Sequence, residues 1–295
     1  MQVLKVTVKP QKDRLDQFVA DLVKNLSRSA AKKLIKEGYI LVDGQVSDPA
    51  YKVRKGDTIK VEIPAAKEVS LKPEKIPLTI IYEDQELLVV DKPPNLVTHP
   101  TLDHPSGTLV NAILNHLKDL KSDDLRPGIV HRLDKNTSGV VVVAKTQTAL
   151  ENLKKQFKDR EVSKTYISLV TGRVEKEVGV IKEKIDRHPK FRSKFTVSKG
   201  GREATTKYKV LERFDKFTLL ELKPFTGRTH QIRVHLSHIG HPVVGDKLYG
   251  GKMLLGRQFL HAAKLELTHP TSGKRMKFES TLPSDLESCL KKLRI

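Results

Sequence analysis

Hydrophobic residues repeat at helical spacing near the start of the chain, at Leu15, Phe18, Val19, Leu22 and Val23. Asp13 precedes this run at the position expected for an N-cap. Ser27 stands at the same position before a second predicted helix over residues 28–37, which Gly38 ends. The pattern therefore predicts two short helices in the first forty residues.

The hydrophobic pattern then changes to that of strands. Residues 39–46 predict a tight hairpin with Asp43-Gly44 at its turn, and residues 53–63 predict a further strand. With the two helices, these strands indicate a small α+β domain over residues 1–63. Residues 64–77 have alternating charges, three prolines and little apolar periodicity, so we interpret them as a linker.

Strands outnumber helices in the remainder, residues 78–295. Strands are predicted over residues 78–82, 87–91, 140–144, 165–170, 207–214, 217–223, 260–269 and 274–280. Helices are predicted over residues 109–118, 148–159 and 284–294, the last with a capping box of Ser284 and Glu287. This mixture predicts an α+β domain with a mainly antiparallel mixed sheet.

The chain is strongly basic, with 55 Lys and Arg residues against 35 Asp and Glu, a formal net charge of +20. The excess is spread along the chain rather than held in a tail. Such a field attracts polyanions, and nucleic acid is the first candidate, although simple solubility would also explain it.

The number of cysteines and the hydrophobic pattern indicate the cellular compartment of the protein. The single cysteine, Cys289, allows no disulfide within the chain, so a reducing compartment fits. The N-terminal segment alternates like a strand and lacks the apolar core of a signal peptide, and no apolar run approaches membrane-spanning length. We therefore expect a cytoplasmic protein that has no membrane partner.

Candidate chemistry begins just before the apolar run of residues 140–144, which suits a strand covered on both faces. The preceding residues contain His131, Arg132 and Asp134 in the string GIVHRLDKNTSG, residues 128–139. A carboxylate beside an arginine, on a loop held by a buried strand, is a good place for catalysis. The alternative is a surface salt bridge that caps a strand.

Two further stretches carry candidate residues. Lys164 and Tyr166 open a predicted strand, and the alternative there is an edge strand with a half-buried tyrosine. The string GRTHQIRVH, residues 227–235, follows a strand and starts a helix that Thr226 or Thr229 could cap. Arg228 would then lie at a helix N-terminus, which favours anions; the alternative is a basic amphipathic helix on the surface.

Metal and nucleotide chemistry are not expected. The histidines between His230 and His241 do not place three ligands on one helical face, and Cys289 has no cysteine partner. The sequence contains neither a Gly-x-x-x-x-Gly-Lys-Ser/Thr loop nor a Gly-x-Gly-x-x-Gly loop. We predict no metal site and no cofactor.

Taken together, these strings resemble the RluA-type pseudouridine synthases from Ile76 to the C-terminus. The strings GIVHRLDKNTSG, KTY (residues 164–166) and GRTHQIRVH carry the resemblance. The first domain resembles the S4 RNA-binding domain through RLD (14–16), SRS (27–29), GYILVDG (38–44) and VRKGD (53–57). With DRHP (186–189), the chain is most similar to the RluD branch, which modifies the helix 69 stem-loop of large-subunit (23S) ribosomal RNA.

The resemblance implies a pseudouridine synthase fold and a set of roles. Asp134 is the catalytic residue, Arg228 is the arginine that keeps it ionised, and Tyr166 lies against the uracil. The implied substrate-binding residues are His131, Arg132, Ile232, Lys164 and Arg233. Within this set, Arg132 would fill the space left by a flipped uridine, its alternative being an ion pair with Asp134. Lys164 and Arg233 would contact phosphate or give local support.

The implied partner is ribosomal RNA, bound in part by cations of the S4-like domain at Arg14, Arg28, Lys32, Lys33 and Lys36. We expect a monomer that needs no cofactor. Within the enzyme class, the alternatives are an RluC-like synthase acting elsewhere on the same RNA and a transfer-RNA synthase. Outside it, the alternative is an RNA-binding ribosome assembly factor.

Overall fold

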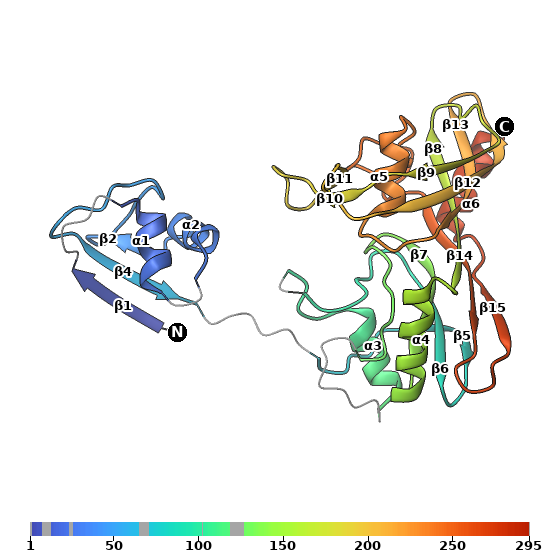
Figure 1. Ribbon diagram of the computed structural model, residues 1–295, viewed down its shortest axis with the longest axis horizontal. Helices are drawn as coiled ribbons and strands as arrows, with labels where there is room; N and C mark the ends of the chain where they lie inside the picture. Colours follow the sequence, from blue (N-terminus) through green and yellow to red (C-terminus); the bar gives the residue numbers. More distant parts are fainter. Residues whose placement is uncertain are drawn as a thin grey trace. The chain divides into compact units, whose positions relative to one another are not determined.

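The computed structural model describes residues 2–7, 13–23, 26–64, 71–101, 103–118 and 127–294 (Figure 1). The chain divides into two compact units, Met1–Glu68 and Val69–Ile295, each with its own hydrophobic core. Residues 65–70 of the predicted linker lie outside the described ranges.

The second half of the predicted linker belongs to the second unit. Leu71 and Ile76 pack against its core, and the Asn111 side chain donates a hydrogen bond to the Lys72 carbonyl at 2.8 Å. Apolar periodicity did not mark this segment because it packs as irregular chain with no helix or strand of its own.

The first unit is a small sheet with two helices. Its elements are β1 (Gln2–Thr7), α1 (Leu15–Leu22), α2 (Arg28–Lys36), β2 (Ile40–Val42), β3 (Gln45–Val46) and β4 (Thr58–Ile63). The strands pair antiparallel in the order β1-β4-β2-β3. The predicted hairpin is confirmed, since Asp43 and Gly44 both have positive φ, at 50° and 80°, as a two-residue hairpin turn requires.

Of the two N-caps predicted for the N-terminal helices, one is confirmed and the other is wrong. The Ser27 side chain accepts a hydrogen bond from the Ala30 N–H and caps α2, as predicted. Asp13 does not cap α1; its N-cap residue is Arg14, which makes no side-chain cap bond. The N–H groups of Leu15 and Asp16 instead donate to the Tyr51 and Pro49 carbonyls, so the neighbouring loop replaces a side-chain cap.

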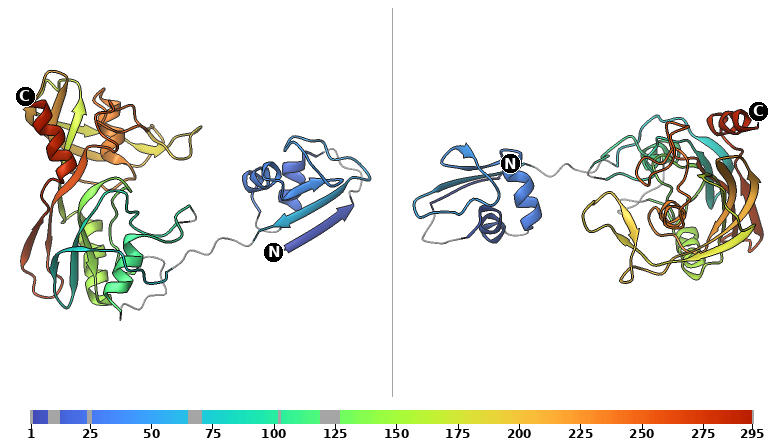
Figure 2. Two further views of the ribbon diagram at one scale, coloured as in Figure 1. Left: turned by 180° about the vertical axis from the view of Figure 1, so that it is seen from behind. Right: turned by 90° about the horizontal axis from the view of Figure 1, so that it is seen from above.

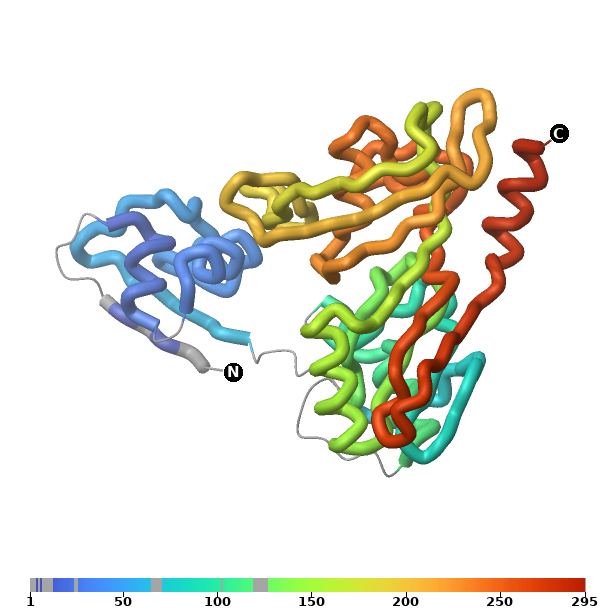
Figure 3. The backbone as a smooth tube through the Cα atoms, turned by 45° about the vertical axis from the view of Figure 1, so that its right-hand side comes forward, coloured from blue at the N-terminus to red at the C-terminus, as the bar shows by residue number. Residues whose placement is uncertain are grey.

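The second unit is built on a large sheet. Its strands are β5 (Thr79–Glu83), β6 (Leu87–Lys92), β7 (Ser138–Ala144), β8 (Ser163–Thr171), β9 (Val178–Lys182), β12 (Thr205–Arg213), β13 (Phe217–Pro224), β14 (Leu260–Thr268) and β15 (Arg275–Glu279). They lie in the order β5-β6-β7-β14-β8-β13-β12-β9, and β15 pairs with β14 to form the long hairpin seen in Figure 3. Among the described strands the pairing is antiparallel except between β7 and β14, which confirms the predicted α+β fold with a mainly antiparallel sheet.

Strand β7 is covered on both faces, as its apolar run predicted. Val140 and Val142 pack in a cluster with α4 (Gln147–Asp159), whereas Val141 and Val143 pack in a cluster with α3 (Leu109–His116). All seven residues of β7 are buried. The loop that precedes β7 is therefore anchored to a rigid strand.

Helices α5 (Gln231–His238) and α6 (Ser284–Leu293) cover the other half of the sheet, around β8 and β13 (Figure 2). The predicted Ser284–Glu287 capping box is wrong. The N-cap of α6 is Pro283, and its carbonyl accepts from the N–H groups of Leu286 and Glu287. Ser284 is already inside the first turn, where its side chain cannot serve as the cap.

A small hairpin of β10 (Ile185–Arg187) and β11 (Phe195–Val197) lies between β9 and β12 in the chain. Neither it nor β9 was predicted. These strands have only three to five residues, and β9 and β10 bury one side chain each, so they lack the alternation that identifies a strand.

Candidate active site

Asp134 stands on a loop that neighbouring backbone holds in place. Gly128 begins the loop with a positive φ of 68°, and a Cβ there would lie 2.3 Å from the Ala144 carbonyl, so only glycine fits. Buried Leu133 is pinned by Thr98, whose hydroxyl donates to the Leu133 carbonyl at 2.8 Å. The loop is thereby tied to the end of β7 and to the segment after β6.

His131 supports this loop from the side of β7. Its Nε2 accepts a hydrogen bond from the Val142 N–H at 3.0 Å, and its ring stacks on Phe157 of α4 at 4.9 Å. Burial lowers the pKa of His131 to about 3, so the ring is neutral and Nε2 stays free to accept. His131 lines the cavity described below, but the nitrogen nearest the strand is already used.

The residues after Asp134 are held by groups that the sequence did not single out. The Lys92 ammonium, fully buried, donates to the carbonyls of Pro93, Leu96 and Lys135 at 2.8, 2.9 and 3.2 Å. Burial lowers its pKa to about 7. Arg257 donates to the Asn136 carbonyl at 3.2 Å. These contacts fix the backbone on which Asp134 stands.

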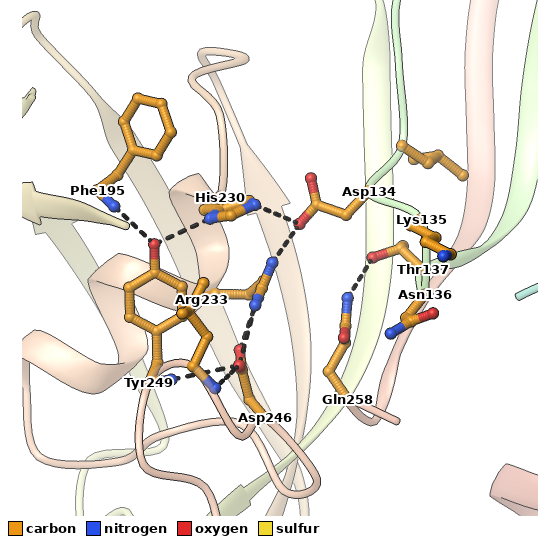
Figure 4. A network of polar contacts seen from close by, with 12 residues as sticks. Asp134, Lys135, Asn136, Thr137, Phe195, His230, Arg233, Asp246, Tyr249 and Gln258 are labelled. Carbon is orange, nitrogen blue, oxygen red and sulfur yellow. Dashed lines mark hydrogen bonds and ion pairs between the residues drawn. The ribbon is translucent and has the colours of Figure 1, made fainter. Parts of the chain in front are cut away.

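Arg233, in the first turn of α5, contacts Asp134 (Figure 4). Its Nη1 donates to Asp134 Oδ2 at 2.9 Å, while Nε and Nη2 form a bidentate pair with Asp246 at 2.6 and 2.9 Å. Arg233 and Asp246 are 7% and 2% exposed. One buried guanidinium thus joins Asp134 to a second, structural carboxylate.

The expected placement of Arg228 beside Asp134 is wrong in this structure. Helix α5 begins at Gln231, after His230 in the left-handed conformation, and neither Thr226 nor Thr229 caps it. Thr226 Oγ1 instead lies 2.6 Å from Gln231 Oε1. Arg228 therefore sits in the preceding turn, where its Nε donates to the Glu203 carbonyl at 3.2 Å. Arg233, for which phosphate contact or local support was expected, contacts Asp134 directly.

A cavity of about 590 Å³ opens beside Asp134. It brings together the residues that the resemblance implied for catalysis and substrate binding: Asp134, Tyr166, Arg228, His131, Arg132, Ile232, Lys164 and Arg233. Arg132 is exposed, Arg228 is half-buried and Ile232 is buried. The lining thus combines apolar and cationic side chains, as a nucleotide would require.

Two titratable groups in this wall have shifted pKa values. Burial, and secondarily the charge of Asp134, raises the pKa of the Tyr166 phenol, which is therefore neutral at ordinary pH. Burial lowers the pKa of Lys164 to about 8. The cavity therefore presents a neutral phenol and a poorly hydrated ammonium close to the carboxylate.

The predicted RNA-binding cations of the first unit differ in exposure and pairing. Arg14 and Arg28 both contact the buried Asp16 carboxylate, at 2.9 and 3.4 Å, and the Arg14 hydrogen bond lowers the pKa of Asp16. On α2, Lys32, Lys33 and Lys36 are exposed, with Lys33 3.7 Å from Glu37. The exposed lysines of α2 are the better placed of these cations for a polyanion.

Within the described ranges, no group of three or more His, Cys, Asp or Glu side chains could hold a metal ion. In the same part of the chain, no helix has the length and apolar character needed to cross a membrane.

Family models match both units. The RNA pseudouridylate synthase model matches residues 86–238, and the S4 domain model matches residues 13–59. The first range includes Asp134, Tyr166 and Arg233, so it contains the centre of the candidate site.

Known proteins with similar sequences cover nearly the whole chain. An uncharacterized RNA pseudouridine synthase of Aquifex aeolicus is 47% identical over 97% of this chain and 96% of its own length. A ribosomal large subunit pseudouridine synthase D of Pseudomonas aeruginosa is 44% identical over 95% of this chain and 92% of its own. The structure of human RNA pseudouridylate synthase domain containing 4 is 26% identical, with a TM-score of 0.60, and covers 73% of this chain and 93% of the human chain.

The second unit, which contains the cavity beside Asp134, is therefore the catalytic domain of an isomerase that acts on RNA. The chain belongs to the RNA pseudouridine synthase family and carries an S4 domain, which confirms the resemblance found in its motifs.

Proposed function

We propose that this enzyme converts uridine to pseudouridine in large-subunit ribosomal RNA, in the helix 69 stem-loop, with Asp134 as its catalytic residue. Several relatives at 42–44% identity are named ribosomal large subunit pseudouridine synthase D, which supports this RNA as the substrate. The observation that carries the proposed chemistry is the contact between Arg233 and Asp134 at 2.9 Å, on the wall of a cavity that also holds Tyr166.

The reaction explains why a carboxylate suffices. The N1–C1′ bond of uridine breaks, the base turns, and C5 joins C1′; C5 releases a proton and N1 gains one. Because no electrons and no outside group are exchanged, no cofactor is required. A carboxylate near C1′ or C6 acts as nucleophile or as base, and Asp134 is the carboxylate that meets the cavity.

Other cavity residues hold the uracil in this proposal. Tyr166 offers a ring for stacking and a neutral hydroxyl, while buried Ile232 packs against the base. Lys164, on the same wall, is placed to contact a phosphate or a uracil carbonyl. The S4 domain adds phosphate contacts through the exposed lysines of α2.

A uridine within a stem must leave the stack to reach Asp134. Arg132, exposed on the cavity wall two residues before Asp134, is proposed to enter the vacated space. Arg132→Ala is expected to lower the single-turnover rate about 10-fold on a paired stem, because unstacking costs a few kcal/mol that the arginine partly offsets. A substrate whose target uridine is mismatched should recover most of that loss.

The matched control for Arg132 is Lys158→Ala, which removes another exposed cation from the cavity wall. Lys158→Ala should affect paired and mismatched substrates equally. If Arg132→Ala also showed the same loss on both substrates, it would have no role in filling the stack.

The substrate assignment is tested by mapping pseudouridines in cells with and without the gene. We expect pseudouridines in helix 69 of the large-subunit RNA to disappear and to return with the wild-type gene but not with the Asp134→Asn gene. Loss at other large-subunit sites or in transfer RNA would move the assignment to one of those substrates. A ribosome assembly defect with every pseudouridine retained would contradict the enzymatic role.

A further inference from the structure

The proposed chemistry leaves one half-buried ring beside Asp134, that of His230, without a role. His230 is the N-cap residue of α5 and adopts the left-handed conformation, with φ at 56°. Its Nε2 lies 3.8 Å from Asp134 Oδ2, the same oxygen that Arg233 contacts (Figure 4). This separation is within ion-pair range but longer than a hydrogen bond.

Tyr249 determines which ring nitrogen of His230 carries the proton. The Tyr249 hydroxyl oxygen accepts a hydrogen bond from the Phe195 N–H at 2.9 Å and lies 2.9 Å from His230 Nδ1. The phenol oxygen already accepts from the Phe195 N–H and still has its own proton to give, and His230 Nδ1 is the acceptor within hydrogen-bond distance. The proton therefore goes to Nδ1, and the proton of the imidazole itself is left on Nε2, facing Asp134.

The protonation states of both partners fit this arrangement. Burial raises the pKa of Tyr249, so the phenol keeps its proton. Burial lowers the pKa of His230, with the charges of Asp134 and Asp246 opposing this shift and those of Arg233 and Arg132 adding to it. The ring is thus neutral at ordinary pH and carries a single N–H.

The surrounding side chains also fix the orientation of the ring. The rings of Phe195 and Tyr249 meet it edge-on, at centroid distances of 5.6 and 5.7 Å. Tyr249 in turn lies against the Arg233 guanidinium at 5.0 Å. Because the ring is packed on two sides, its Nε2–H cannot turn away from the carboxylate.

We propose that His230 is a positioning residue for Asp134, which supplies a neutral Nε2–H to Oδ2 in a tautomer set by Tyr249. Arg233 and His230 then meet the same oxygen, and Oδ1 points away from both (Figure 4) and is available to the substrate. A small movement of the carboxylate when RNA binds brings the Nε2–H to hydrogen-bond distance. This inference rests on the proposed catalytic role of Asp134.

The test compares His230→Asn and Tyr249→Phe in the full-length enzyme on a helix 69 stem-loop RNA. Asparagine tolerates the left-handed backbone and removes the imidazole. We expect His230→Asn to lower kcat about 10- to 100-fold, through misplacement of the carboxylate, with KM unchanged within about 2-fold. Tyr249→Phe should lower kcat less, since the ring remains. His116→Asn and Tyr82→Phe, which change a histidine and a tyrosine bonded to carboxylates elsewhere, should retain wild-type kcat.

Nitrogen-15 NMR of labelled histidine reports the tautomer of His230 directly. A purely structural role for His230 would not require one particular tautomer. The His230 signals, identified by their loss in His230→Asn, should show the Nε2–H tautomer in wild type and a mixture in Tyr249→Phe. An Nδ1–H tautomer or an imidazolium in wild type, or wild-type kcat in His230→Asn while Asp134→Asn is inactive, would overturn this inference alone. Turnover by Asp134→Asn would instead remove the proposed role of Asp134.

Discussion

Asp134→Asn is expected to lower the single-turnover rate of pseudouridine formation by at least about 10³-fold, the loss typical of removing a nucleophile or base. The amide keeps the shape of the side chain and its contact with Arg233 but loses the charge and basicity that the reaction needs. The rate is measured as tritium released from RNA labelled at uridine C5, because C5 loses its hydrogen when it joins C1′.

The same variant should fold and bind RNA. Arg233 keeps both hydrogen bonds to Asp246, and the amide oxygen of the substituted side chain can still accept from Nη1, so no buried cation is left unpaired. The matched control is Asp215→Asn, the same change at a side chain that is 89% exposed. Measurable turnover by Asp134→Asn, at a rate near that of Asp215→Asn, would exclude Asp134 from the chemistry.

The fold could be predicted where local pattern and tertiary packing agree. The apolar run of β7 predicted a strand covered on both faces, and Asp43-Gly44 predicted its hairpin, because each depends on residues adjacent in sequence. Helix caps were harder to predict from the sequence. At α1 the first N–H groups donate to carbonyls of a neighbouring loop, which no side-chain pattern reveals, and at α6 the N-cap is Pro283, one residue before the serine of the predicted capping box.

The site shows the same division. Strings that resemble the family identified the residues around the cavity, but the choice between Arg228 and Arg233 depended on where α5 begins. That start is decided by the backbone conformation of His230, which the sequence does not show. Lys92 and Arg257 could not be found either, because each reaches the Asp134 loop from far along the chain.

Asp246 lies in a glycine-rich stretch of the sequence, residues 240–250. A Cβ at Gly245 would lie 1.9 Å from the Arg257 carbonyl, so this glycine permits a close backbone approach beside Asp246. The glycines alone did not predict that the Asp246 carboxylate would turn inward to meet Arg233, because this depends on contacts with distant parts of the chain.

The second large effect is expected from Arg233→Lys. This change keeps the positive charge but removes the planar guanidinium, which can donate two parallel hydrogen bonds to one carboxylate. An ammonium cannot form the bidentate pair with Asp246 and also reach Asp134. We expect kcat to fall at least about 10²-fold through loss of carboxylate orientation. Stability should fall by about 1–3 kcal/mol, because Asp246 is buried and loses a hydrogen bond to a charged partner. Thermal unfolding and single-turnover kinetics measure the two effects.

Arg228→Lys and Arg213→Lys complete the comparison with Arg233→Lys. Arg228 is half-buried on the cavity wall and, within the described part of the chain, forms no ion pair with a carboxylate, so a lysine that preserves its charge toward RNA should leave kcat and the unfolding temperature nearly unchanged. Arg213 also donates several hydrogen bonds through its guanidinium, to Glu177 and to the carbonyls of Val174 and Glu175. It lies outside the cavity lining. Its lysine variant should lose stability without losing kcat.

A large kcat loss in Arg228→Lys with full activity in Arg233→Lys would return the partnership with Asp134 to Arg228. Equal kcat losses in Arg233→Lys and Arg213→Lys would attribute the effect to the fold rather than to the carboxylate.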